Sequence, residues 1–133
     1  MSTDYNDKRP MKSNGLLKSF QFASQGIKHA FIHERNMKIH GMVSIVVILL
    51  GFVLGLTLTE WLFVLFAIAG VISLELINTA IERVVDLTTS HYHPLAKQAK
   101  DVSAGAVFIY SCLSVIIGII IFLPKIIQKF ELL

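Results

Sequence analysis

The sequence predicts an all-α integral membrane protein with three transmembrane helices and an N-terminal amphipathic helix on the membrane surface. Of its 133 residues, 54% are hydrophobic and 16% are charged, a balance typical of chains with long lipid-facing segments. Its apolar runs are long enough for helices that cross a hydrocarbon core of about 30 Å, which takes about 20 residues. The runs lack the period-2 alternation of a closed membrane barrel.

Three spans are expected at about 41–59, 61–82 and 102–124. The first and third ranges carry no charged residue, and the second carries Glu75 deep within its apolar part. The residues before the first run are polar, and no small-residue cleavage site follows it, so we expect no cleaved signal peptide. The lone Cys112 has no partner for a disulfide within the chain, and we interpret it as a packing residue.

The region before the first span divides into two parts. Residues 1–14 are polar and are expected to form a flexible cytoplasmic tail, so that residues 15–133 make a single membrane domain. From Leu16 onward, apolar residues recur at helical spacing with basic residues between them. This pattern predicts an amphipathic helix over about 16–36 that lies on the cytoplasmic leaflet. We favour a membrane anchor over the alternative of a lid across a site.

The distribution of lysine and arginine predicts the orientation in the membrane. The first forty residues carry seven of these residues, 83–101 carry three, the turn at Glu60 carries none and the C-terminal tail carries two. The positive-inside rule therefore places the N-terminus and the 83–101 loop in the cytoplasm and the C-terminus outside. The net charge of +3 follows from this asymmetry, so we expect no nucleic-acid partner.

A polar stripe enters the second span. Its members are Glu75, Asn78, Glu82 and Asp86, at positions that share one helical face. If the helix begins at Trp61, Glu75 lies about 21 Å along the axis. An interhelical polar clamp is the structural alternative. We favour a functional role because carboxylates on one face repel each other unless a cation or proton intervenes. The stripe fits a proton or cation pathway, or a metal-assisted reaction at the membrane surface.

The loop before the third span supplies further polar groups. They are His91, Tyr92, His93, Lys97, Lys100 and Asp101. Lysine beside carboxylates suggests a polyphosphate ligand that a divalent cation bridges to the acids, and magnesium prefers carboxylate and phosphate oxygens. The two histidines are a weak indication of a transition-metal pair. Because no GxxxxGK[ST] motif is present, any nucleotide site has to be unconventional.

Three motifs together resemble the small prokaryotic diacylglycerol kinase family, and more closely its undecaprenol kinase branch in Gram-positive bacteria. They are ERNMKIH (34–40), SLELINTAIERVVDL (73–87) and HPLAKQAKDVSAGAV (93–107). The resemblance covers about residues 16–124. It implies a homotrimeric, ATP-dependent lipid kinase of the bacterial plasma membrane, with active sites shared between protomers near the cytosolic interface.

The resemblance also implies roles for individual residues. Glu75 matches the catalytic base that takes the proton from the substrate lipid hydroxyl. Glu34 and Glu82 match the carboxylates that hold Mg²⁺ with ATP, although the pattern around Glu34 alone indicates a solvated residue at the interface. The remaining residues implied at the ATP site are Asn78, His91, Tyr92, His93, Lys100 and Asp101.

Some positions depart from the diacylglycerol kinases. Gly15 and Phe22 stand where that branch has an arginine and a tyrosine, and His40 replaces an acidic residue. We therefore expect undecaprenol as the substrate, with diacylglycerol as the alternative. A small proton-coupled oligomeric transporter with Glu75 as carrier is the rival from another class. It gives no role to Lys100 and Asp101, and a purely structural membrane subunit explains neither these residues nor Glu75.

Overall fold

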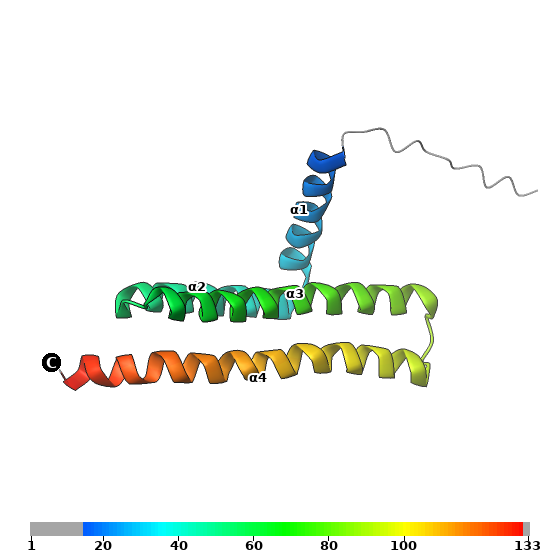
Figure 1. Cartoon of the computed structure of the whole chain (residues 1–133). Helices are drawn as coiled ribbons and strands as arrows, with labels where there is room; N and C mark the ends of the chain where they lie inside the picture. Colours follow the sequence, from blue (N-terminus) through cyan, green and yellow to red (C-terminus); the bar gives the residue numbers. More distant parts are fainter. Residues whose placement is uncertain (1–14, 132–133) are drawn as a thin grey trace, which may run out of the picture.

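The structure is a computed structural model that describes residues 15–131. Over these residues the chain forms four helices and no strand, which confirms the predicted all-helical class (Figure 1). The helices are α1 (Gly15–His33), α2 (Arg35–Leu54), α3 (Leu58–Thr88) and α4 (Pro94–Glu131). The tail predicted at 1–14 lies outside the described residues.

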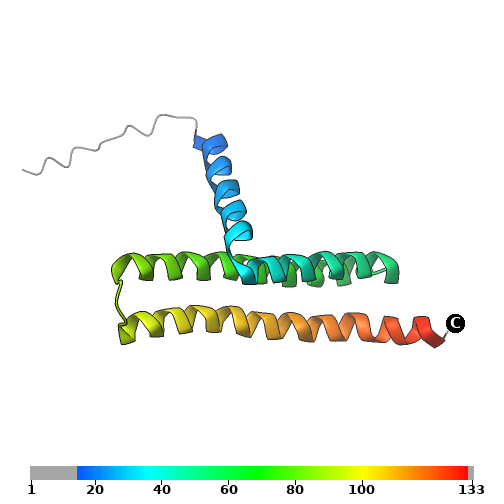
Figure 2. The same cartoon turned by 180° about the vertical axis from the view of Figure 1, so that it is seen from behind.

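The helices α2, α3 and α4 lie side by side, whereas α1 projects away from them (Figure 1). Figure 2 shows the same arrangement from behind, with α3 and α4 lying antiparallel on the same side of the short connection that joins them. α3 contacts each of the other three helices. Side chains on α3 can therefore meet partners from every other part of the fold.

Three helices, α2, α3 and α4, are long and apolar enough to cross a membrane. Large apolar side chains such as Phe52, Phe66 and Phe108 lie on their exposed faces, as expected where lipid is the solvent. The helices do not begin and end where the spans were expected. α2 ends at Leu54, so the range 41–59 includes the turn to α3, and α4 extends well beyond 102–124 at both ends.

Local sequence explains the tight turn between α2 and α3. Gly55 adopts φ 65°, and the backbone N–H groups of Gly55 and Leu56 donate to carbonyls in the last turn of α2, a glycine C-cap. Thr57 and Glu60 then form a reciprocal capping box at the start of α3. Trp61 packs against Phe52 with ring centroids 4.9 Å apart.

The turn end of the bundle also contains its main apolar cluster. The buried members are Leu56, Val64, Ile121 and Phe122. An ion pair of 3.1 Å between Lys125 and Glu60 closes this end. The α3–α4 connection lies at the opposite end, which leaves the polar stripe of α3 away from the apolar cluster.

Candidate active site

The polar stripe of α3 emerges gradually from the bundle toward the α3–α4 connection. Glu75 and Asn78 are buried, with 3% and 6% of the surface of each whole residue exposed. Glu82, two turns further along, is half-buried, and Asp86 is exposed. The predicted stripe therefore connects the interior of the bundle to water, and its buried end requires polar partners.

Glu75 finds its partner on α2. The Nε2 atom of His40 lies 3.3 Å from Oε1 of Glu75. Both residues line a cavity of about 330 Å³ between α2, α3 and α4, together with Asn78. The carboxylates of Glu34 and Glu82 are near enough to act electrostatically on Glu75. Helical periodicity and packing thus bring three acids to one region.

Asn78 connects the stripe to α4. Its side-chain amide donates a hydrogen bond of 3.0 Å to Oε1 of Glu82. The hydroxyl of Ser103 donates a hydrogen bond of 2.6 Å to Oδ1 of Asn78. Ser103 is itself buried. The amide is therefore fixed from both sides, which orients Glu82 and leaves its second oxygen without an interaction from Asn78.

Glu34 lies at the junction of α1 and α2, where it is the N-cap residue of α2. Its Oε1 atom accepts a hydrogen bond of 2.9 Å from Nη2 of Arg83 on α3. The other terminal nitrogen of Arg83 lies 2.7 Å from Nε2 of His29 on α1. Glu34, the acid that the family resemblance implies as a magnesium ligand, is thus hydrogen-bonded to the helix that carries Glu75.

The basic residues pair with acids at the connection end. Lys100 contacts Asp86 across α3 and α4 at 2.5 Å, and Lys97 pairs with Asp101 within α4. The connection spans 89–93, and its residues His91, Tyr92 and His93 are exposed. Their hydrogen bonds in the described part of the chain are local, to Thr89, Leu95 and Lys97. The structure thus places Lys100 beside the stripe and leaves the connection facing outward.

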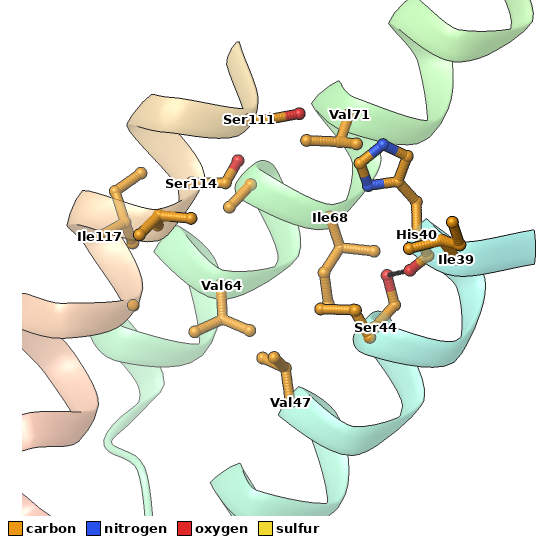
Figure 3. A pocket seen from close by; sticks show the side chains of 14 residues that line it. Ile39, His40, Ser44, Val47, Val64, Ile68, Val71, Ser111, Ser114 and Ile117 are labelled. Atoms are coloured by element: carbon orange, nitrogen blue, oxygen red, sulfur yellow. Dashed lines mark hydrogen bonds between the residues drawn. The ribbon is translucent and has the colours of Figure 1, made fainter. Parts of the chain in front are cut away.

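An apolar groove of about 360 Å³ approaches the acidic cavity from within the bundle. Valine and isoleucine side chains from α2, α3 and α4 make up most of its walls (Figure 3). His40 and Ser111 line both the groove and the acidic cavity. The site can therefore receive an apolar chain on one side and a polar group on the other.

Two carboxylates suit the proposed magnesium ion. No group of three or more His, Cys, Asp or Glu side chains suitable for a metal occurs in residues 15–131. Glu34 and Glu82 each use Oε1 in the contacts described above and have a second oxygen. Because magnesium is commonly held by one or two carboxylates with phosphates and water, these residues fit a metal that arrives with a nucleotide.

Three residues of this arrangement were absent from the predicted site. The sequence pattern assigns no site role to Arg83 or Ser103. It distinguishes His40 only as a departure from the diacylglycerol kinases. The sequence does contain an indication for Ser103, because this residue lies one helical turn after Lys100 in the third motif. The contacts of Arg83 and His40 depend on how α1 and α2 pack against α3, which no local pattern indicates.

Taken together, the fold and the acidic site define a membrane protein with a buried carboxylate between an apolar groove and a charged surface. Residues 21–122 match the model of the prokaryotic diacylglycerol kinase family. The chain belongs to this family, as the three motifs predicted. Family membership makes it an ATP-dependent lipid kinase of the bacterial membrane.

Individual relatives cover most of the chain. It is 47% identical over 112 residues to the undecaprenol kinase of Bacillus subtilis (strain 168). The aligned region covers 84% of this chain and 91% of the relative. The chain is 39% identical over 128 residues to a diacylglycerol kinase of Synechocystis, covering 91% of this chain and 73% of the relative. A Haemophilus influenzae diacylglycerol kinase is 35% identical over 105 residues, or 79% and 86% of the two chains.

Proposed function

We propose that the protein transfers the γ-phosphate of MgATP to undecaprenol and so makes undecaprenyl phosphate. The observation that carries this proposal is the apolar groove that leads to the buried carboxylate of Glu75. The 47% identity to the Bacillus subtilis undecaprenol kinase favours a prenyl alcohol. Diacylglycerol is the second candidate, because diacylglycerol kinases are also similar over most of the chain.

The groove suits the alcohol end of a hydrocarbon chain. Along α2 it runs from Ile39 to Val47, about 12 Å at 1.5 Å per residue. Its volume of about 360 Å³ falls within the range of small-molecule sites, about 300–1,000 Å³. A chain in this groove brings its hydroxyl toward His40 and Glu75, while the rest of the lipid extends into the bilayer.

Glu75 is the catalytic base in this proposal. The hydroxyl proton of the lipid passes to the Glu75 carboxylate as the lipid oxygen bonds to the γ-phosphorus. The bond between that phosphorus and the β–γ bridging oxygen breaks, and ADP leaves with the electron pair. Phosphoryl transfer depends mainly on positioning and charge neutralisation, and a buried, oriented carboxylate beside the substrate contributes to the positioning.

The nucleotide occupies the water-facing end of the stripe. Glu34 and Glu82 would hold Mg²⁺, which neutralises charge on the phosphates when it is bound. Asn78 orients Glu82 through its 3.0 Å hydrogen bond, and Lys100 supplies a positive charge to the phosphates. The other residues assigned to ATP are Asp101 and the exposed connection residues His91, Tyr92 and His93.

The membrane arrangement completes the proposal. The N-terminus and the 83–101 loop face the cytoplasm, where ATP is available, and the C-terminus lies outside. α1 lies on the cytoplasmic leaflet, and three protomers associate so that neighbouring chains share each site. The exposed apolar faces of α2, α3 and α4 leave surface for both lipid and such partners.

Transfer of labelled γ-phosphate from MgATP tests the function directly. Purified protein in mixed micelles receives undecaprenol or diacylglycerol in separate reactions, with Glu75→Gln as the inactive control. Preferential labelling of undecaprenol by the native protein is expected. Preferential labelling of diacylglycerol would replace the substrate with the second candidate, and labelling of neither lipid would overturn both.

A further inference from the structure

His40 occupies the place where the two cavities meet. Its ring comes from α2 and lines both the apolar groove and the acidic cavity. Figure 3 shows the ring at one end of the groove lining, with Val47 and Val64 toward the other end. A hydroxyl that approaches Glu75 along the groove therefore passes beside His40.

Within residues 15–131, the Glu75 carboxylate makes its polar side-chain contact with His40. Nε2 of the ring and Oε1 of the carboxylate are 3.3 Å apart, and the two side chains are 26% and 4% exposed. A buried carboxylate without a hydrogen-bond donor is costly. His40 is therefore the group placed to orient the Glu75 carboxylate.

We propose that His40 is a positioning residue for Glu75, an inference that rests on the proposed lipid kinase function. In its neutral form the ring donates its Nε2–H to Oε1 of Glu75, which directs Oε2 toward the lipid hydroxyl. The ring forms no bond to substrate and carries no proton in the transfer step. It acts through the carboxylate, which it keeps in a single orientation.

The charge of the ring matters as well as its hydrogen bond. A protonated histidine beside a carboxylate favours the ionised acid and makes it a weaker base. Glu75 on α3 is the titratable group that faces the ring, and Glu34 and Glu82 act on Glu75 from further away. From α4 the shared lining residue is Ser111, which does not titrate in this range. A charge on the ring is therefore expected to lower kcat.

Two substitutions separate the hydrogen bond from the charge. His40→Gln keeps an N–H donor that can reach Glu75 but cannot become charged, whereas His40→Ala removes the donor. The quantities to measure are kcat, the KM values for ATP and lipid alcohol, and the pH profile of kcat between about pH 5 and 8, where histidine changes charge. Unfolding in micelles and ATP binding report whether each variant is intact.

The expected results differ between the two variants. His40→Ala lowers kcat by about 100-fold, the lower end of a base's usual contribution, and leaves the KM for ATP within about twofold. His40→Gln recovers about tenfold of that loss, and the pH at which kcat falls to half lies lower than in the native protein. A purely structural role would lower stability without moving this pH profile.

Three outcomes would overturn the inference while leaving the kinase function in place. In the first, native protein transfers phosphate and His40→Ala is equally fast. In the second, His40→Gln is as slow as His40→Ala. In the third, His40→Gln has the native pH profile, a result that also decides the matter if His40→Ala does not fold. Absence of transfer by the native protein would instead reject the proposed function itself.

Discussion

Arg83 donates a hydrogen bond of 2.9 Å to Glu34, although 49 positions separate the two residues. The same guanidinium lies 2.7 Å from the ring of His29. It therefore joins α3 to α1 and to the N-cap residue of α2. The contact also places a fixed positive charge on a carboxylate that we propose as a magnesium ligand, so that arginine and metal compete for it.

Removal of this charge is expected to ease metal binding. Arg83→Ala should lower the Mg²⁺ concentration for half-maximal activity by about two- to fivefold, because a partly exposed ion pair contributes about 0.2–1 kcal/mol. The unfolding midpoint in micelles should change little for the same reason. The measurement is a titration of activity with Mg²⁺ at fixed ATP and lipid concentrations.

Lys125→Ala is the matched control for Arg83→Ala. It also removes a cation from an ion pair, with Glu60, but at the opposite end of the bundle. Its Mg²⁺ requirement should equal that of the native protein. A higher requirement in Arg83→Ala would mean that Arg83 orients Glu34 for the metal, and competition would be wrong.

The helices and the stripe were predictable because each depends on one segment alone. Apolar length indicates a spanning helix, and the helical period places Glu75 and Asn78 on one face. Where the helices end was less predictable. Charged residues return after residue 124, yet α4 continues to Glu131, since loss of an apolar run marks the edge of the lipid rather than the end of a helix.

The partners of the stripe depend on packing between helices. Arg83 lies one position after Glu82, and its contact with Glu34 exists only because α1 and α2 meet beside α3. His40 reaches Glu75 for the same kind of reason. In sequence both resemble ordinary charged residues near a membrane boundary. The family resemblance implies a role for Glu34, but it does not reveal that Arg83 forms a hydrogen bond to this residue.

Replacement of the proposed base should stop the chemistry without releasing the nucleotide. Glu75→Gln keeps the size of the side chain and removes its ability to accept the lipid proton, so turnover should be lost while ATP affinity stays within about twofold of native. Lipid phosphorylation and equilibrium ATP binding are measured on the same preparation. An equally active variant would exclude Glu75 as the base.

The proposed phosphate contact of Lys100 predicts a specific effect on ATP. Lys100→Met keeps the alkyl chain and removes the charge, so the KM for ATP should rise about tenfold, equivalent to about 1.4 kcal/mol. Lys129→Met is the control on the same helix, because Lys129 lies at the opposite end of α4, where its amine donates a hydrogen bond to the carbonyl of Val53. Equal changes in both variants would indicate a general charge effect rather than a contact.

The last prediction concerns stability and follows from a close approach between α3 and α4. The ring of Tyr110 lies so near Gly70 that an added Cβ would overlap its atoms. The Tyr110 hydroxyl donates a hydrogen bond of 3.1 Å to the carbonyl of Phe66. Gly70→Ala should therefore displace the ring and destabilise the fold by about 1–3 kcal/mol, seen as a lower unfolding midpoint in micelles.

Two comparisons show whether the ring is the cause of this loss. Gly105→Ala adds a methyl group on α4, whereas Gly70 is on α3, and nothing lies within 4 Å of the Cβ added at position 105. This variant should therefore be no less stable than the native protein. In a Tyr110→Leu background the shorter side chain makes room, and Gly70→Ala should cost less there than alone. Strictly additive losses would show that the two residues do not interact, because an alanine that clashed with the ring could not cost the same after the ring is gone.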